Sequence, residues 1–383
     1  MKIVYCTDTV CYPGGIQTVT MVKANALAKI PGNQVWIVVT DHNKKPLLKL
    51  ENVELINLAV NYYEDDWKGY WYVIKGIFLK RRQHQKRLEK VLNEINPDIV
   101  VSTGTSEKNF LPTLKIKSSP AFIREVHFEK NYRLRSAKGW KDRLVAHVAN
   151  FYDYGYRIRK YHKIVVLTKE DKENNWREWN NELVIPNPMT SQLDRSSVCV
   201  SPKVLAAGRL VRQKNFTSLI RIWYKVAEKH PEWTLEIWGN GEQKEMLQDQ
   251  INRLNLGRTV FLRGFTSALQ QKMIQSSIFL LSSDYEGFGL VLVEAMSVGL
   301  PIVSYACPAG PSDLIEDGQN GFLIPMGNED LFAEKICTLI ENEELRKGMG
   351  KNALIKSKEY QIDPIISRWM LLFEELLEGK KSC

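Results

Sequence analysis

Glu286 and Glu294 stand eight positions apart and frame a glycine-containing turn that follows a buried apolar run. Eight residues of helix separate two carboxylates by up to ~12 Å, too far for a paired acid/base site. The spacing suits a ligand with hydroxyl-bearing ends and an anionic middle, because the helix N-terminus between the glutamates offers N–H groups to phosphate. The alternative is a capping acid at 286 and an ordinary helical residue at 294. The residues between them include Gly287, Phe288, Gly289, Leu290 and Val291.

Two cations and two glycines follow other predicted strands. Arg209 and Lys214 lie on the loop after the apolar run 203–207, where they can neutralise a diphosphate. Taken singly, each is more often a solvated surface charge. Gly14 and Gly15 follow the first strand and precede a helix, so that the backbone can approach an anion there. The alternative for this glycine pair is a plain tight turn.

Short apolar runs alternate with helical patterns along the chain, in two successive series. The alternation predicts an α/β fold of parallel sheets covered on both faces by helices, in which ligands gather at the carboxyl ends of the strands. Two prolines and a polar stretch between 185 and 202 predict the border between two doubly wound domains. The expected strands are Lys2–Thr7, Gln34–Thr40, Ile99–Ser102, Ala121–Val126 and Lys163–Leu167, then Lys203–Ala207, Thr234–Trp238, Val260–Leu262, Ile278–Ser282, Ile302–Tyr305 and Gly321–Ile324; the expected helices include Thr18–Ile30, Val73–Glu94, Leu144–Arg159 and Asp363–Lys381.

This series of motifs resembles glycosyltransferase family 4, retaining enzymes of the GT-B fold that use nucleotide-sugar donors. The resemblance covers nearly the whole chain and implies two Rossmann-like domains facing across a cleft. Residues 1–188 would bind the acceptor, joined by a C-terminal helix at 363–383, and residues 189–362 would bind the donor. A last helix packed wholly on the second domain is the alternative. Besides Glu286 to Glu294, the supporting motifs are Gly14-Gly15, Arg124-Glu125-Val126-His127, Ile185-Pro186-Asn187, Gly208-Arg209-Leu210 with Lys214, Gly239-Asn240-Gly241, Arg263-Gly264-Phe265, Gly299-Leu300-Pro301-Ile302-Val303 and Asp317-Gly318-Gln319-Asn320-Gly321.

The resemblance implies a role for each residue of the donor site. Arg209 and Lys214 would bind the diphosphate and stabilise charge on the leaving nucleotide. Glu294 would hold the ribose hydroxyls, and Glu286 would contact the transferred sugar. The backbone N–H groups of residues 288–291 would reach a sugar hydroxyl or a phosphate.

Further positions take their roles from the resemblance alone. His127 would sit beside the donor sugar and the acceptor, although a lone histidine is more often structural. Gly15, next to Gly14, would let the backbone approach the phosphate as the domains close. The loop that contains Phe265 would face the base.

The chain has no Asp-x-Asp motif, because no two of its aspartates are two positions apart. We therefore expect a metal-independent enzyme with no cofactor, in which cations and a helix N-terminus stabilise the leaving diphosphate. The resemblance implies transfer of a hexose or N-acetylhexosamine, with retention, from a UDP-sugar to a glycan or lipid-linked hydroxyl in surface polysaccharide synthesis. The alternatives are a nucleotide-sugar epimerase of related fold and a non-catalytic protein that binds sugar nucleotides.

The formal net charge of +9 on 383 residues lies in the first half, where residues 1–190 hold 31 Lys and Arg against 20 Asp and Glu. The aromatic and basic stretch Trp67–Lys90 resembles a helix at an anionic membrane, and a solvated helix with a core-facing aromatic side is the favoured alternative. No nucleic-acid module accompanies the charge, so no nucleic-acid partner is expected. Six scattered cysteines and no apolar run of membrane-spanning length predict a cytoplasmic protein, peripheral at most on the inner membrane face.

Overall fold

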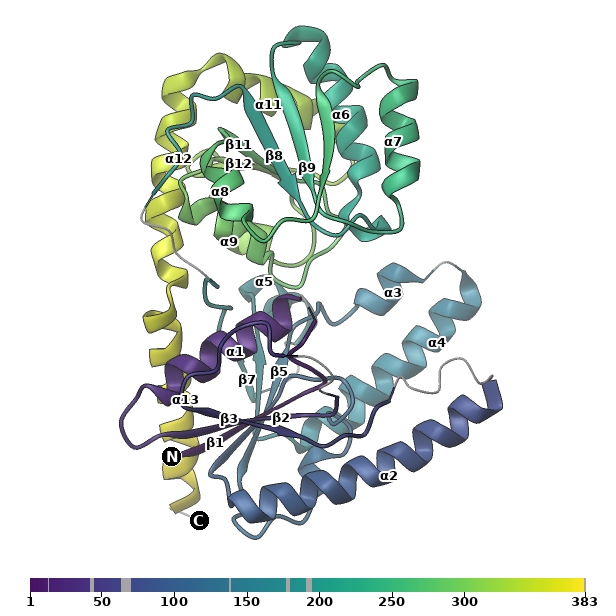
Figure 1. Ribbon diagram of the computed structural model, residues 1–383, viewed down its shortest axis with the longest axis vertical. Coiled ribbons are helices and arrows are strands. Elements are labelled where there is room, and N and C mark those ends of the chain that lie inside the picture. The colour runs from purple at the N-terminus through teal and green to yellow at the C-terminus, as the bar shows by residue number, and fades with distance from the viewer. Residues whose placement is uncertain are drawn as a thin grey trace. The chain divides into compact units, whose positions relative to one another are not determined.

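The computed structural model describes residues 1–12, 14–41, 45–62, 70–137, 139–176, 180–190 and 195–381, and of residues 70–78 and 381 the backbone only. The chain forms two compact units, each built on one sheet (Figure 1). The first unit comprises Met1–Leu167, Asn174–Thr190 and Ile362–Cys383. The second comprises Thr168–Glu173 and Ser191–Gln361.

The described part of the first unit contains a seven-stranded sheet in the order β3-β2-β1-β4-β5-β6-β7, with every neighbouring pair parallel. The order reverses at β1, which pairs with β2 on one side and β4 on the other, so the crevice at the switch point lies between β1 and β4. The central strands are buried on both faces, as expected for parallel strands. The strands are β1 (Lys2–Thr7), β2 (Gln34–Val39), β3 (Val53–Asn57), β4 (Ile99–Ser102), β5 (Ala121–Val126), β6 (Lys163–Val166) and β7 (Glu182–Val184).

Helices cover this sheet, and the last one comes from the far end of the chain. Helix α13 packs its apolar side into the core around β1, through Ile365, Trp369 and Phe373. The helices are α1 (Gly15–Ala28), α2 (Tyr70–Ile95), α3 (Tyr132–Ser136), α4 (Trp140–Asn150) and α13 (Ile362–Lys381), with a π-helix at Phe151–Arg157 and 3₁₀ turns at Leu111–Thr113 and Ile158–Lys160. Most of helix α5 (Lys169–Asn175) belongs to the second unit.

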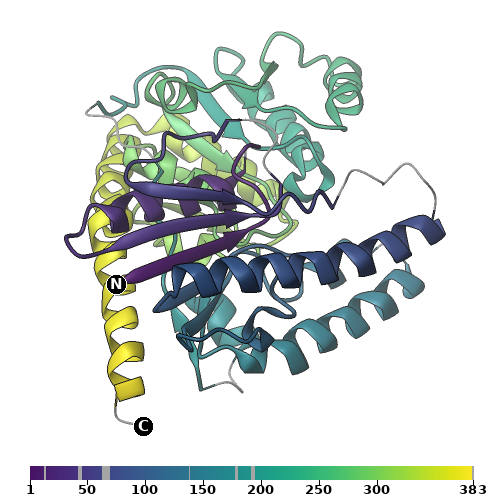
Figure 2. The same cartoon turned by 60° about the horizontal axis from the view of Figure 1, so that its bottom comes forward.

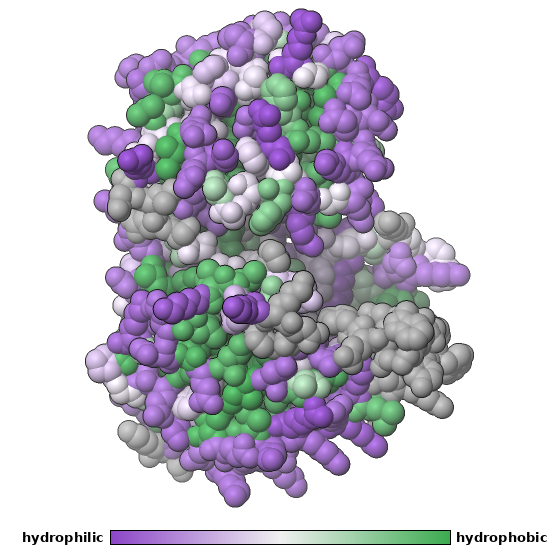
Figure 3. Space-filling view, viewed as in Figure 1, coloured by the Kyte–Doolittle hydropathy of each residue, from purple (hydrophilic) through white to green (hydrophobic). Residues whose placement is uncertain are grey.

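The described second unit repeats the plan with six parallel strands in the order β10-β9-β8-β11-β12-β13, so that its switch point lies between β8 and β11. Its helices are amphipathic where they reach solvent. Helix α7 buries Leu247 and Ile251 and shows a hydrophilic outer face (Figure 3). The elements are β8 (Lys203–Ala207), α6 (Phe216–Lys229), β9 (Thr234–Trp238), α7 (Lys244–Arg253), β10 (Val260–Gly264), α8 (Leu269–Ile274), β11 (Ile278–Leu281), α9 (Leu290–Ser297), β12 (Ile302–Tyr305), α10 (Pro311–Leu314), β13 (Gly321–Ile324), α11 (Glu329–Glu341) and α12 (Glu343–Ser357), with 3₁₀ turns at Arg212–Lys214 and Lys358–Tyr360.

The predicted α/β class with two Rossmann-like units is confirmed. Two strands were not predicted: β3 mixes polar and apolar residues at one sheet edge, and β7 has three residues at the other. The helix expected at Leu144–Arg159 is wrong in part, because the α-helical pattern stops at Asn150 and a π-helix follows. Within the described residues, no helix combines the length and apolarity needed to cross a bilayer.

Candidate functional site

In the second unit, hydrogen bonds join the loop after β8 to the loop after β11 at the switch point. Asn215 adopts a left-handed conformation (φ 50°), and its side-chain oxygen caps α6 by accepting from the Ser218 N–H. Ligands of doubly wound sheets bind beyond the carboxyl ends of such strands. The joining bonds run from Ser282 Oγ to Lys214 O (2.8 Å), from Asn215 Nδ2 to Asp284 Oδ1 (2.8 Å), from Gln213 Nε2 to Tyr285 O (2.8 Å) and from Asp284 N to Gln213 O (2.8 Å).

These two loops hold an ion pair between two of the predicted site residues. Lys214 Nζ lies 2.6 Å from Glu286 Oε1, with side chains 15% and 8% exposed. The Ser283 hydroxyl donates to the same oxygen at 2.6 Å, and the Glu286 N–H donates to Pro308 O at 2.7 Å. Glu286 is therefore anchored by Lys214 and Ser283, and no side chain caps α9. The alternative that Glu286 is an N-terminal capping acid is wrong.

The first turn of α9 presents its backbone rather than its side chains. In the described part of the chain, the N–H groups of Phe288, Gly289, Leu290 and Val291 donate to no other group. Gly289 has a left-handed conformation (φ 88°), which favours glycine. The Phe288 ring is buried and meets the ring of Tyr360 edge to face at 5.8 Å. The segment can accordingly bind an anion only through its N–H groups, which the helix dipole assists.

The remaining predicted donor residues lie near the same edge of this sheet or on the helix that begins there. Arg209, just after β8, is exposed, and its guanidinium group has no ion-pair or hydrogen-bond partner among the described residues. Glu294 is half-buried within α9, and Gly287 precedes its first turn. Phe265, directly after β10, has 65% of its surface exposed. The structure thus brings Lys214 and Glu286 into contact, and it leaves Arg209 and Phe265 open to solvent.

A close backbone approach shapes this edge of the sheet. Gly239, after β9, has φ 144°, and a Cβ there would overlap the carbonyl oxygen of Gly208. Gly208 in turn leaves room for the Lys214 stem, which a Cβ would meet at 3.2 Å. These glycines let the loops after β8 and β9 pack together and place the Lys214 ammonium beside Glu286.

In the first unit, His127 lies just after β5 in a buried polar cluster. Its Nε2 lies 3.6 Å from Glu125 Oε1 and has no hydrogen-bond partner among the described residues. Burial lowers the pKa of His127 to about 4, against the opposing effect of the Glu125 carboxylate. Lys23, from α1, forms a fully buried ion pair with Glu125 and lies 4.6 Å from the centre of the Trp369 ring. With its pKa lowered to about 4, the His127 imidazole is neutral at pH 7.

The crevice between β1 and β4 holds two carboxylates, Asp8 and Glu107, and Arg124 Nη1 lies 3.9 Å from Glu107 Oε1. Asp8 accepts four hydrogen bonds, from the N–H and hydroxyl groups of Thr105 and Ser106, at 2.6–3.2 Å. Glu107 accepts at Oε1 from the Ser102 hydroxyl (2.7 Å), while its buried Oε2 has no partner in the described structure. Burial, reinforced by the Asp8 charge, raises the pKa of Glu107 to about 7.

The glycine pair predicted to approach a phosphate lies at the start of α1. Gly15 is the first residue of the helix, and Gly14 precedes it with φ −178°, an extended conformation open to any residue. Both are exposed. A Cβ on Gly14 would meet only the flexible end of Gln17. The described backbone therefore gives no steric reason for glycine at position 14.

Several contributors to these sites were not among the predicted residues. Ser283, Asn215 and Gln213 orient the ion pair or join its loops, and Asp8 with Glu107 fills the other crevice. Their proximity to strand ends is a signal in the sequence: Asp8 directly follows β1, and Ser283 lies two residues after β11. Their partners lie up to 98 positions away, and no local pattern encodes such pairing.

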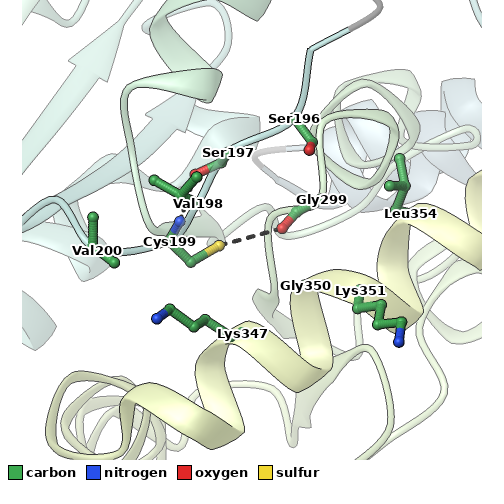
Figure 4. A pocket seen from close by; sticks show the side chains of 10 residues that line it. All are labelled: Ser196, Ser197, Val198, Cys199, Val200, Gly299, Lys347, Gly350, Lys351 and Leu354. Atoms are coloured by element: carbon green, nitrogen blue, oxygen red, sulfur yellow. Dashed lines mark hydrogen bonds between the residues drawn. The ribbon is translucent and has the colours of Figure 1, made fainter.

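A pocket of about 410 Å³ lies elsewhere on the second unit, between the segment before β8 and helix α12 (Figure 4). Cys199 Sγ donates to Gly299 O at 3.3 Å within it. Because residues 196–200 precede β8 and Gly299 precedes β12, the pocket lies at the amino ends of those strands. Ligands of parallel sheets bind at the opposite edge, and no predicted site residue lines the pocket.

Among the described residues, no group of three or more His, Cys, Asp or Glu side chains is placed to hold a metal ion. The site of the second unit therefore consists of the Lys214–Glu286 pair, the exposed Arg209 and the N–H groups that open α9. Such a set can neutralise and orient a diphosphate.

Comparison with known proteins agrees with this fold. Residues 200–355 match the family model described as "Glycosyl transferases group 1". An uncharacterised glycosyltransferase of Haemophilus influenzae is 29% identical over 361 residues, which are 93% of this chain and 95% of the relative. A poly(ribitol-phosphate) alpha-N-acetylglucosaminyltransferase of Staphylococcus aureus is 27% identical, over 75% of this chain and 57% of its own length. The structure of Anabaena Alr3699/HepE in complex with UDP and glucose superimposes with a TM-score of 0.73 at 19% identity, covering 98% of this chain and 99% of that one.

Proposed function

We propose that this chain, a homologue of group 1 glycosyltransferases, is a metal-independent, retaining enzyme of family 4. It transfers a hexose or N-acetylhexosamine from a UDP-sugar to a hydroxyl of a glycan or lipid-linked acceptor. The relative from Staphylococcus aureus, named for N-acetylglucosamine transfer to a ribitol-phosphate polymer, supports a surface polysaccharide acceptor, and the UDP-bound Anabaena structure supports the nucleotide.

The observation that carries the proposal is the Lys214–Glu286 pair beside the N–H groups of α9, which have no acceptor in the described part of the chain. An ammonium has three N–H donors, and Glu286 takes one of them, so two remain for phosphate oxygens. Arg209 adds a second cation with no partner of its own among the described residues. These fixed charges and N–H dipoles stabilise the diphosphate as the bond to the sugar breaks.

The other residues act on the two ends of the donor. Glu286, anchored by Ser283 and Lys214, contacts the transferred sugar, and Glu294 holds the ribose hydroxyls. The acceptor hydroxyl attacks the face from which the nucleotide departs, and the β-phosphate takes its proton, so the anomeric configuration is retained. His127, neutral at pH 7, lies beside the donor sugar and acceptor in this proposal.

A donor panel tests the proposal. UDP-hexoses, UDP-N-acetylhexosamines and GDP-hexoses are incubated with the chain in EDTA, and nucleotide release is followed with and without a hydroxyl acceptor. We expect UDP to raise the melting temperature, UDP release to persist in EDTA, and NMR of the product to show the donor's anomeric configuration.

Three results would contradict the proposal. Loss of turnover in EDTA would overturn metal independence, and inversion at the anomeric carbon would overturn retention. Conversion of the UDP-sugar to its epimer without nucleotide release would identify an epimerase instead.

A further inference from the structure

An apolar stripe on the first unit faces solvent along α4 and the π-helix that continues it. Trp140, Leu144, Val148 and Phe151 recur at i, i+4, i+8 and i+11, which places them on one side of the helix. Trp140 is 73% exposed and Phe151 is 77% exposed. Val145, Tyr152 and Tyr156 are exposed beside them. Single exposed apolar residues are ordinary, whereas a contiguous stripe indicates an interaction surface.

The segment meets the core of the first unit through few side chains, among them the half-buried Tyr154. Along 140–157 the side chain of Ala146 alone is buried, and the next buried residue is Ile158. Helix α4 lies at the periphery of the first unit in both ribbon views (Figures 1 and 2). The described chain therefore leaves the stripe uncovered.

Positive charge is concentrated in the sequence that contains the stripe. Residues 130–160 contain nine Lys and Arg against two Asp. One of the two acids, Asp153, is already paired with Lys108 (2.6 Å) and Arg133 (2.7 Å). The Arg157 guanidinium lies 5.0 Å from the centre of the Tyr152 ring. Aromatic residues beside cations are typical of segments at the lipid headgroup level.

We propose that the face formed by residues 140–160 docks peripherally on an anionic lipid surface. The charge favours this occupant over a second copy of the chain, because a two-fold contact would place like charges on both sides. Anionic headgroups neutralise the cations while the apolar stripe enters the headgroup boundary. This surface differs from the stretch Trp67–Lys90, where residues 67–69 and the side chains of 70–78 lie outside the described residues.

Vesicle co-sedimentation of the full chain tests the proposal. Vesicles of phosphatidylcholine alone are compared with vesicles that also contain phosphatidylglycerol. We expect binding only to the anionic vesicles. Trp140→Ser/Phe151→Ser should weaken it at least about tenfold, and Arg143→Gln/Lys160→Gln about fivefold per cation, with a matching loss as salt rises.

Ile355→Ser/Leu371→Ser is the matched control, because these apolar residues of α12 and α13 are also more than half exposed. It should bind like the unchanged chain. All variants should keep the melting shift given by UDP, which separates docking from the proposed donor site. If the Trp140→Ser/Phe151→Ser variant does not fold, the charge variant decides.

The proposal is overturned if the stripe and charge variants bind anionic vesicles as the unchanged chain does, or if phosphatidylcholine alone suffices. It is also overturned if sedimentation velocity shows that the stripe variant converts a dimer to a monomer while its vesicle binding is unchanged.

Discussion

The two units order their first six strands alike, but they place different balances of charge in their switch-point crevices. Between β8 and β11, the second unit places Lys214 beside Glu286, with Arg209 close along the chain and, at α9, N–H groups that no described residue accepts. Between β1 and β4, the first unit places two carboxylates: Asp8 accepts four hydrogen bonds, and Glu107 lies 3.9 Å from Arg124. The same topology therefore builds the proposed anion site in one half and a crevice with two carboxylates in the other. The difference lies in the few residues that follow each strand.

The largest expected effect is on the cationic crevice. Lys214→Ala should lower transfer about 10²- to 10³-fold, because in the proposed mechanism it removes a donor to the charge that develops on the diphosphate. The measurement is UDP release with acceptor, at saturating donor. Lys225→Ala is the control, since its ion pair with Asp330 has the same 2.6 Å length but is exposed. Equal activity of the two variants would remove Lys214 from the mechanism.

The carboxylate crevice should instead respond to pH. The pKa of Glu107 is about 7 in the folded chain and ordinarily 4.5, so folding favours the protonated form. That stabilisation is complete below about pH 4.5 and is lost as pH rises through 7, at a cost of about 3 kcal/mol. Relative to the unchanged chain, Glu107→Gln should therefore gain stability between about pH 4.5 and 8.

The difference in unfolding free energy between the Glu107→Gln variant and the unchanged chain isolates this effect. Both proteins contain His127, whose pKa is lowered to about 4, so its contribution to stability is lost as pH falls and cancels in the difference. Hydrogen exchange of the β1 and β4 amides reports it locally. Glu94→Gln, on the exposed side of α2, should leave the pH dependence unchanged. If the difference in unfolding free energy between Glu107→Gln and the unchanged chain does not vary with pH, the Glu107 carboxyl is not held neutral in this crevice.

Asp8→Ala tests whether the first crevice is structural. Four donors from Thr105 and Ser106 lose their acceptor, and we expect the unit to lose about 2 kcal/mol of unfolding free energy. The melting shift given by UDP should persist, and exchange of the β4 amides should accelerate. Asp249→Ala, exposed on α7, should change stability by less than about 0.5 kcal/mol. Loss of UDP binding in Asp8→Ala would mean that the crevices do not act separately.

The smallest expected effect belongs to Arg209. Arg209→Gln should weaken transfer at low donor concentration about tenfold, because a charge-assisted hydrogen bond to phosphate is lost. Stability should not change, since the side chain is exposed and unpartnered among the described residues. Arg258→Gln, also exposed, serves as the control. An unaltered dependence of rate on donor concentration would place Arg209 outside the donor site.

Local sequence patterns predicted most of the strands and helices and about half of the residues of the candidate site. Buried strands such as β8 and β11 are continuous apolar runs and were predicted within one residue, whereas edge strands such as β3 lack that pattern. Lys214 and Glu286 stand out by type and place, but their pairing spans 72 positions and depends on Asn215 and Gln213. Their contact could not be predicted from local sequence, because it depends on the hydrogen bonds that join the two loops in the folded chain.

The placement of α13 has a consequence for synthesis on the ribosome. Its Trp369 and Phe373 belong to the same apolar cluster as Ile3 and Tyr5 of β1, yet they are translated more than 360 residues later. Domains ordinarily fold in the order in which they emerge, the N-terminal one first. Here the half that emerges first keeps part of its core exposed to water until the last helix is made. The nascent N-terminal half therefore depends on its own solubility, or on a chaperone, throughout elongation.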